Sequence, residues 1–327
     1  MCILIATTRH PDYPLILLSN RDEYFRRPTQ PAHFRPLNEQ DKILSPADLG
    51  RLENGTWIGI TTTGRIAVLL NYRETDSNHS LSEISRGVLP LEYLCSTKSD
   101  EKWFSTLEST KSGKSIDLSK IGGFSLVFGT LAVDPDTGKI NNLNIISNRG
   151  DHGKIFDSSI MNAKPQVNGN LVADPDHYDI SVKDTFGISN SLYYNPWKKV
   201  KLGEDLLNEL IDDSVEHEYD KRKIVDECFK VLTTDTFDKD TFKSHSFEKK
   251  FLELRNSIFI PPLETEFEDN EKNLTIGKYY GTRTQTVILL DKHGNLDYYE
   301  RDMHNSDNVE TDSEINQHFN FKISPGL

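Results

Sequence analysis

Short apolar runs, separated by polar turn residues, recur along the chain and predict antiparallel β-hairpins. Pro, Gly, Asp and Asn stand between the runs, and these residues favour the tight reversal that joins two strands. Four hairpins are expected: residues 2–8 with 14–20, 56–61 with 66–71, a pair within 123–150 that turns at DPDTGK, and a pair within 284–302 that turns at DKHG.

The first hairpin brings a polar run to the N-terminal cysteine. If its turn is centred on residues 9–13, Cys2 lies opposite Asn20. Arg21 and Asp22 follow directly, so an amide, a guanidinium and a carboxylate gather beside one thiol. We therefore take this end of the hairpin as a candidate functional site.

The ends of the next two hairpins add further polar residues. The second hairpin ends at Asn71 and Tyr72, and the third ends at Asn148. Functional residues are often carried at the ends of strands, because a rigid sheet positions them there. The pattern predicts an active-site rim that is built from strand termini.

Apolar residues spaced three and four apart predict helices between the hairpins. Two helices are expected within 81–110, and single helices at 203–213, 221–234 and 247–257. Long hairpins with helices in blocks are typical of an α+β protein, here two antiparallel sheets packed together with helices outside. One domain is predicted for the whole chain, 1–327. Its irregular parts are surface loops at 235–246 and 261–275 and a mobile C-terminal tail at about 303–327.

Composition narrows the classes of function. The chain has 327 residues, of which 27% are charged, and its net charge is −13. This excess of carboxylates argues against nucleic-acid binding, which depends on Lys and Arg at phosphates. No apolar run approaches the roughly 20 residues of a membrane-spanning helix. The N-terminus lacks the pattern of a cleaved targeting peptide, so a cytoplasmic protein is expected.

The spacing of cysteine and histidine predicts neither a disulfide framework nor a metal site. Cys2, Cys95 and Cys228 lie far apart without a CxxC pair, and the histidines show no HxH or HExxH spacing. No required cofactor is expected. Covalent haem is not indicated because no CxxCH motif is present, whereas non-covalent haem held in an apolar pocket stays open as a cargo.

A cysteine at position 2 suggests one particular chemistry. Methionine is removed enzymatically when the second residue is small, and Cys2 would then carry a free α-amino group with a pKa of about 8, close to the thiol value of about 8.5. That amine can act as the base for its own side chain. Arg21 would favour the thiolate and Asp22 would hold or orient the amine. Asn71 or Asn190 could donate to an oxyanion.

A simpler interpretation stays open beside this one. Cys2 is also compatible with a small buried strand residue, since free cysteine is often buried. Arg21 and Asp22 are equally compatible with a structural ion pair at a strand end.

Several motifs in order along the chain resemble one family. They are MCILIA with LLSNRDE, then GTWIGI, LLNYRE, SRG, SNRG, FGISNSLYYNPWKKVKLG and YYGTRTQTVILLD. The sequence is similar over roughly 1–300 to the NRDE family, also called the transport and Golgi organisation protein 2 family. The resemblance implies a four-layer αββα N-terminal-nucleophile (Ntn) hydrolase-like fold, similar to that of bile-salt hydrolases and penicillin V acylases.

The resemblance also implies roles for individual residues. Cys2 matches the nucleophile, Arg21 and Asp22 match a nearby pair that the bile-salt enzymes space differently, and Asn71 resembles an oxyanion asparagine. A ligand would meet pocket residues from several segments: Asn20, Tyr72, Asn148, Asn190 and Arg283. Arg283 lies on a strand where it would share the face of Gln285, Val287 and Leu289 if side chains alternate regularly.

Two functions follow as hypotheses. The family resemblance implies a protein of haem or lipid mobilisation and of secretory and Golgi organisation, in the cytoplasm with Golgi or mitochondria as associated organelles. The alternative is a thiol-dependent hydrolase of an amide, ester or thioester. Either function implies a small apolar ligand or acyl-type substrate, which the aromatic run SLYYNPWKKV (191–200) would line unless it only packs a loop.

Overall fold

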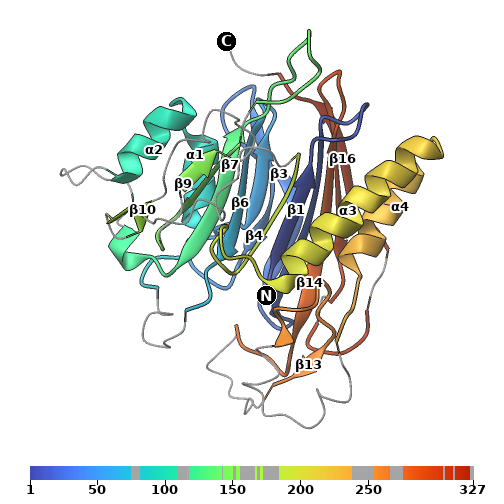
Figure 1. The fold of residues 1–327 in the computed structure, drawn as a ribbon. Coiled ribbons are helices and arrows are strands. Elements are labelled where there is room, and N and C mark those ends of the chain that lie inside the picture. Colours follow the sequence, from blue (N-terminus) through green and yellow to red (C-terminus); the bar gives the residue numbers. More distant parts are fainter. Residues whose placement is uncertain are drawn as a thin grey trace. The chain divides into compact units, whose positions relative to one another are not determined.

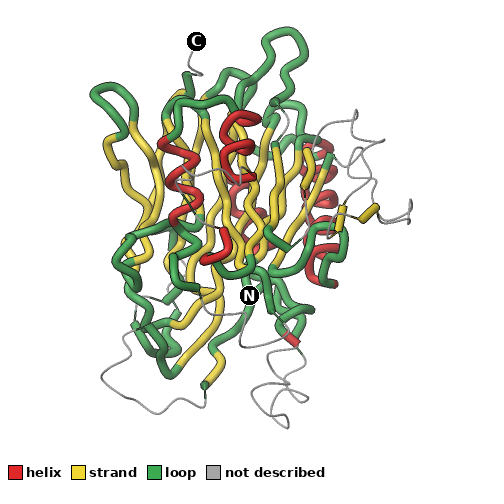
Figure 2. The backbone as a smooth tube through the Cα atoms, turned by 90° about the vertical axis from the view of Figure 1, so that its left-hand side faces the viewer, coloured by secondary structure: helices red, strands yellow, loops and turns green. Residues whose placement is uncertain are grey.

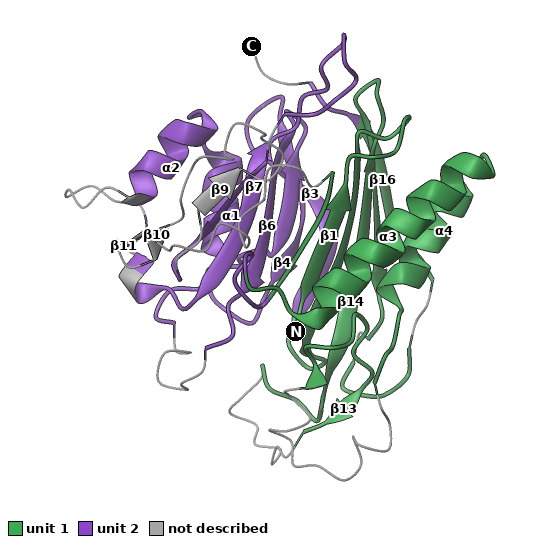
Figure 3. Ribbon diagram, viewed as in Figure 1, with its two compact units in different colours: residues 1–28, 184–189, 195–321 green, residues 29–183, 190–194, 322–327 purple. Residues whose placement is uncertain are grey.

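The computed structural model groups the chain into two compact units (Figure 3). Unit 1 comprises 1–28, 184–189 and 195–321, and unit 2 comprises 29–183, 190–194 and 322–327. The structure describes residues 1–74, 82–108, 116, 118–141, 143–149, 152–154, 166–167, 170–171, 184–237, 253–265, 275–304, 306–311 and 314–324. The chain passes between the units after residues 28, 183, 189, 194 and 321.

Unit 1 is built on a seven-stranded sheet (Figure 1). Its order is β12 (Thr185–Ser189), β1 (Ile3–Thr7), β2 (Leu15–Tyr24), β14 (Tyr279–Leu290), β15 (Asn295–Asp302) and β16 (Gln317–Lys322), with β13 (Leu263–Glu264) also paired to β14. The neighbours of β1, β2 and β14 in this sheet are antiparallel. Both faces of β1 are buried, as are both faces of most of β2, which explains their nearly continuous apolar sequences.

Two helices cover one face of this sheet, as Figure 1 shows in yellow and orange. They are α3 (Lys198–Glu216), against β1 and β12, and α4 (Lys221–Leu232), against β2 and β14. Asp220 caps α4 by accepting a hydrogen bond from the Lys223 amide. The core between helices and sheet includes Ile5, Leu18 and Phe229, all at most 1% exposed.

Unit 2 contains a second seven-stranded antiparallel sheet whose strand order follows the sequence. Its strands are β3 (Thr29–Pro36), β4 (Lys42–Asp48), β5 (Ile58–Thr61), β6 (Arg65–Asn71), β7 (Phe124–Thr130), β8 (Asn144–Ser147) and β9 (His152–Lys154). Helix α1 (Val88–Cys95) packs on this sheet, followed by α2 (Asp100–Glu108) and the 3₁₀ turn η2 (Leu118–Lys120). A strand pair, β10 (Gln166–Val167) and β11 (Asn170–Leu171), is separate. Strands make up much of the described backbone (Figure 2).

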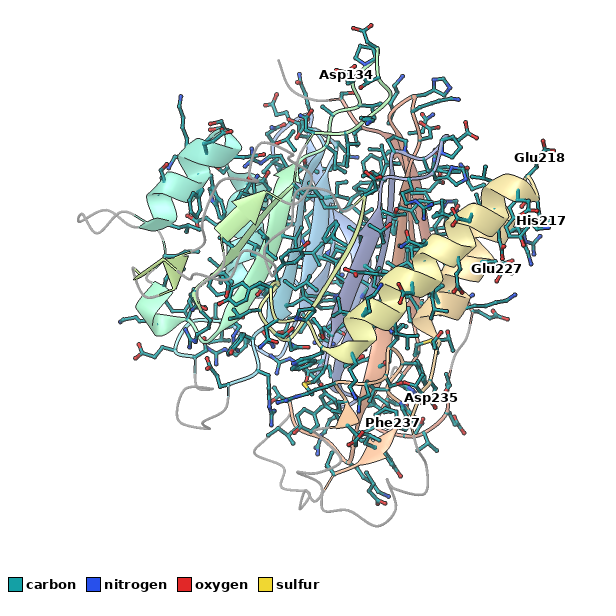
Figure 4. All side chains as sticks on the ribbon, in the orientation of Figure 1. Asp134, His217, Glu218, Glu227, Asp235 and Phe237 are labelled. Atoms are coloured by element: carbon teal, nitrogen blue, oxygen red, sulfur yellow. The ribbon has the colours of Figure 1, made fainter. Side chains whose placement is uncertain are left out.

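The predicted α+β class with two antiparallel sheets and accompanying helices is confirmed, and so are all four hairpins. The turn residues act as expected. Asp134, at the tip of the third hairpin in Figure 4, accepts hydrogen bonds from the Asp136 and Thr137 amides. Gly138 and Gly294 take positive φ angles of 66° and 80° in the third and fourth hairpins.

The helix predictions are confirmed for α1, α2, α3 and α4. The helix predicted at 247–257 lies largely outside the described residues. Strands β3 and β4 were not expected. Strand β3 is largely exposed and contains Pro, and β4 is mostly buried but has only Ile43 and Leu44 before Ser45 and Pro46, so no clear apolar run marks either strand. The segment predicted as a mobile tail contains strand β16, at one end of the unit 1 sheet, where alternate residues are exposed.

The register predicted for the first hairpin is wrong by one residue. Ile3, not Cys2, pairs with Asn20, and Ile5 pairs with Leu18. Because β1 is apolar and buried on both faces, either register keeps apolar side chains inside, so alternation alone cannot select between them.

Candidate functional site

The α-amino group of Met1 is buried in unit 1 and is held by two partners. Its nitrogen lies 2.6 Å from Asp22 Oδ2 in an ion pair. It also donates a hydrogen bond of 2.7 Å to the hydroxyl of Tyr280. Burial lowers the pKa of this amine, although the nearby Asp22 carboxylate works in the opposite direction.

Strand pairing positions the Asp22 carboxylate. Asp22 lies opposite Thr282 in the β2–β14 ladder, and the Thr282 hydroxyl donates 2.7 Å to Asp22 Oδ1. The same hydroxyl accepts from the Ile260 amide at 2.8 Å, and the Thr282 amide donates back to the Ile260 carbonyl at 2.8 Å. The β2–β14 ladder therefore positions the Asp22 carboxylate, and Ile260 fixes the Thr282 hydroxyl that donates to it.

Lys199 brings a second amine to the same carboxylate. It lies in the first turn of α3, its side chain is fully buried, and its Nζ is 3.9 Å from Asp22 Oδ2. The same Nζ donates to the backbone carbonyl of Met1. Burial lowers the pKa of Lys199, opposed by the charge of Asp22. Two buried amines thus share one carboxylate, which favours a neutral amine over two ammonium ions.

The sequence motifs did not predict Lys199, Tyr280 or Thr282 as site residues, although a signal for the lysine is present. Lys199 falls four residues before Gly203 and eight before Leu207, on the buried stripe of α3. A lysine on an apolar helix face is seldom buried without a partner.

Cys2 lies directly beside this group, with its backbone also fixed. The Ser189 hydroxyl donates 2.6 Å to the Cys2 carbonyl, and Cys2 Sγ is 3.8 Å from the Asp22 carbonyl oxygen. The residue keeps some exposed surface, yet burial of the thiol raises its pKa, outweighing the positive charges of the α-amine and Arg21. With Met1 in place, the thiol is protonated at neutral pH.

The other predicted site residues of unit 1 are engaged in structural contacts. Asn20 is fully buried, and its amide donates to the carbonyls of Leu232 and Ile258 at 2.8 and 3.0 Å. Arg21 Nη2 lies 3.4 Å from Glu23 Oε2, and Asp22 Oδ2 lies 2.6 Å from the Met1 amine.

Arg283 does not share a face with Gln285 by regular alternation. The β2–β14 register shifts between Thr282 and Thr284, which makes Arg283 the extra residue of a β-bulge. Its guanidinium is buried and donates to the backbone carbonyls of Arg27 and His304. The bulge also explains why Thr282 faces Asp22 while Gln285 faces Asn20.

Unit 2 carries the remaining predicted residues and brings two of them together. The side-chain amide of Asn190 donates to the backbone carbonyl of Asn71 at the end of β6. The backbone carbonyl of Asn190 accepts a hydrogen bond of 2.8 Å from the backbone amide of Arg73. Tyr72 is half-buried, and its amide donates 2.8 Å to the Gly123 carbonyl.

Asn148 stabilises the turn before β7. Its side chain accepts from the Phe124 amide at 3.0 Å and donates to the Ile121 and Gly122 carbonyls, both at 3.2 Å. Asn148 thus has partners for both ends of its amide within unit 2.

Trp197 shows what part of the aromatic run does. In unit 1 it packs against an apolar group that we call the Met1 cluster: Met1, Leu254, Ile260, Leu263 and Tyr280. The Arg255 guanidinium lies 5.2 Å from the centre of the Trp197 ring. Phe237, labelled in Figure 4, also packs on the cluster. Packing of Trp197 on the Met1 cluster agrees with the loop-packing interpretation of this segment.

Within the described ranges, no three or more His, Cys, Asp or Glu side chains are grouped so that they could bind a metal ion. Across those same ranges, no helix is long and apolar enough to span a membrane.

Comparison with known proteins identifies the family. A family model described as Transport and Golgi organisation 2 matches residues 1–305. The chain belongs to this family. The transport and Golgi organisation 2 assignment confirms the resemblance drawn from the sequence motifs.

Relatives of the transport and Golgi organisation 2 family align along most of the chain. An uncharacterised protein of Saccharomyces cerevisiae is 31% identical over 323 residues, covering 94% of this chain and 93% of that protein. Transport and Golgi organization protein 2 homologs of Bos taurus and Homo sapiens are each 27% identical over 296 residues, covering 90% of this chain and 88% of theirs. Among solved structures, a mutant conjugated bile acid hydrolase from Clostridium perfringens aligns at 12% identity with a TM-score of 0.36, over 100% of this chain and 94% of that one.

Proposed function

We propose that this protein is a thiol-dependent hydrolase of an amide, ester or thioester bond, with Cys2 as its N-terminal nucleophile after removal of Met1. One observation carries the proposal: a buried α-amine, paired with Asp22 at 2.6 Å, stands one residue before a thiol-bearing residue whose backbone is also anchored. Removal of Met1 makes the Cys2 nitrogen the α-amine, with Asp22 and Lys199 close to the chain end.

The proposed reaction has two steps. The neutral Cys2 amine takes the thiol proton, and the thiolate attacks the substrate carbonyl. The resulting ammonium returns the proton to the departing amine, alcohol or thiol, which leaves an acyl thioester on Cys2. Water then adds to the thioester while the amine accepts its proton, and the acid and the free thiol are released.

Asp22 and Lys199 set the protonation of the amine in this proposal. A buried amine beside a lysine and a single carboxylate loses its proton more readily than an exposed one, as the lowered pKa of the Met1 amine indicates. A neutral amine near pH 7 is the form that general-base catalysis requires.

Intact-mass measurement of the natively expressed protein tests the first requirement. A mass corresponding to a chain that begins at Cys2 is expected, and retained or acetylated Met1 would contradict the mechanism.

Hydrolysis of a panel of acyl amides, esters and thioesters tests the second requirement, which is catalysis by the Cys2 thiol. Cys2→Ala and Cys2→Ser should abolish turnover, while Cys95→Ser, at an exposed cysteine, should not.

A second candidate is a binding protein for haem or a lipid-like ligand, with a role in secretory and Golgi organisation. The mammalian relatives are named transport and Golgi organization protein 2 homologs, which supports the organisational role. The raised pKa of the Cys2 thiol with Met1 in place favours a non-catalytic thiol. Haem or acyl-CoA titration separates the two. Saturable one-to-one binding that survives Cys2→Ala, together with complementation of a deletion strain by that variant, would favour the carrier.

A further inference from the structure

Unit 1 holds Met1 by each of its functional groups. The α-ammonium contacts Asp22 and the Tyr280 hydroxyl at 2.6 and 2.7 Å. The carbonyl accepts a hydrogen bond from Lys199. The side chain packs in the Met1 cluster, and the whole residue is 4% exposed. An amino group, a carbonyl oxygen and an apolar side chain are therefore all recognised at one place.

Loss of Met1 leaves these partners without a ligand. A methionine-sized space lined by Leu254, Ile260 and Leu263 would expose apolar contacts to a cavity, which destabilises the folded state. Asp22 and Lys199 would each lose a partner, although they lie 3.9 Å apart and Thr282 still donates to Asp22. An occupant that restores the two lost contacts would therefore stabilise the site.

We propose that, in the chain that begins at Cys2, this site binds a free apolar α-amino acid of about the size of methionine. The proposal rests on the removal of Met1 in the proposed function, but not on hydrolysis. The ligand ammonium takes the place of the Met1 amine at Asp22 and Tyr280. One carboxylate oxygen accepts from Lys199, the other faces the Cys2 ammonium, and the side chain enters the Met1 cluster.

The contacts of Met1 itself favour an α-amino acid over other apolar ligands. Its ammonium contacts Asp22 and Tyr280, and its carbonyl oxygen accepts a hydrogen bond from Lys199. A fatty acid has no ammonium for Asp22 and Tyr280, and an alkylamine has no oxygen for Lys199. Either ligand would restore only part of these polar contacts.

Occupancy would also act on the proposed chemistry. A carboxylate beside the Cys2 amine favours the ammonium form of that amine. Because the proposed mechanism needs the neutral amine as base, a bound amino acid is expected to inhibit hydrolysis.

Isothermal titration calorimetry tests the site directly. It uses the full-length chain, which is cleaved from an N-terminal fusion so that it begins at Cys2. L-Methionine and L-norleucine are expected to bind one to one. N-acetylmethionine and L-glutamate should each bind at least tenfold more weakly, because the first lacks the ammonium group and the second lacks the apolar side chain. Equal binding of all four compounds, or no saturable binding of L-methionine, would overturn the proposal.

Three protein variants sharpen the test. The chain that retains Met1 should not bind L-methionine, because Met1 itself occupies the site. Lys199→Met should weaken binding at least tenfold, whereas Lys201→Met, at an exposed lysine of the same helix, should leave it unchanged. Cys2→Ala should keep binding while losing hydrolysis, which separates failure of this site from failure of the proposed function.

The test also covers a chain that folds poorly without Met1. In that case L-methionine is expected to raise the folded fraction measured by circular dichroism, and N-acetylmethionine is not. Equal effects of the two compounds would likewise contradict a site for α-amino acids.

Discussion

Asp22 is the single residue on which the N-terminal group depends most. Its side chain is fully buried and lies within 2.6 Å of the Met1 amine and 3.9 Å of Lys199. In the described part of the chain, no other carboxylate forms an ion pair with either amine. The ion pairing of the N-terminal amine thus depends on one carboxylate, which accepts a hydrogen bond from Thr282.

Replacement of this carboxylate should be costly. Asp22→Asn removes the anion that two buried amines share, so the free energy of unfolding is expected to fall by about 3–5 kcal/mol. Urea unfolding measures the change. Asp12→Asn, which breaks an exposed pair with Lys292, is the control and should cost no more than about 1 kcal/mol. Similar losses in the two variants would contradict the buried ion-pair geometry.

Cysteine reactivity should report the presence of Met1. In the chain that retains Met1, alkylation near pH 7 is expected to be fastest at Cys95, which is exposed, and slowest at Cys228, which is fully buried. Cys2 should react at an intermediate rate because burial raises the pKa of its thiol. In chain that begins at Cys2, the Cys2 rate should rise above that of Cys95. Peptide mapping after timed alkylation gives all three rates. An unchanged order after loss of Met1 would argue against an activated thiol.

Among the secondary-structure elements, β15 is tied to its neighbours through one carboxylate. Asp297 accepts from Lys221 of α4 at 2.7 Å, and from His318 and Asn320 of β16 at 2.9 and 3.0 Å. Burial raises the pKa of Asp297, but these three hydrogen bonds outweigh burial and leave the pKa below its usual value. The network explains how a mostly polar strand such as β16 is held in the sheet.

This network makes stability depend on acid pH. Because the pKa of Asp297 is lower in the folded than in the unfolded chain, its contribution is fully present above about pH 4 and is lost as pH falls through the folded value. Asp297→Asn is therefore expected to lower the free energy of unfolding by about 1–3 kcal/mol at pH 7. The difference from wild type should shrink below about pH 4.

Unfolding by urea at a series of pH values checks this prediction. Asp136→Asn, at an exposed turn residue, is the control and should show no such pH-dependent difference. A difference for Asp297→Asn that stays constant from pH 7 to pH 3 would show that ionisation of Asp297 does not contribute.

At the scale of the whole molecule, the two sheets differ in how far apart in sequence their strands lie. Every strand of the unit 2 sheet pairs with its neighbour in the chain. In the unit 1 sheet, β1 pairs with β12 and β2 pairs with β14, across more than half of the chain. Closing such long loops costs more entropy than forming a local hairpin.

This difference predicts an order of folding. The amide hydrogens of β6 and β7 should become protected before those that join β2 to β14, because local pairing precedes long-range pairing. Pulsed hydrogen exchange during refolding, read by mass spectrometry, measures both sets in one experiment. Earlier protection of the β2–β14 ladder would show that the long-range strands form the folding nucleus.

The sequence by itself determined the local elements and the family. Alternating apolar residues and turn residues such as Asp134 and Gly294 specify hairpins within a few residues, and the apolar stripe specifies α3, because these signals depend on neighbours in the chain. The cluster of Cys2 and Asp22 was also predicted, since one short hairpin suffices to bring them together.

Tertiary structure alone decided how those residues are used. The register of β1 against β2 depends on packing on both faces, and the bulge at Arg283 depends on a partner strand more than 250 residues away. The convergence of Met1, Asp22, Lys199 and Tyr280 likewise requires a helix and two strands from distant parts of the chain. Burial and ion pairing are properties of that assembled environment, so no local pattern encodes them.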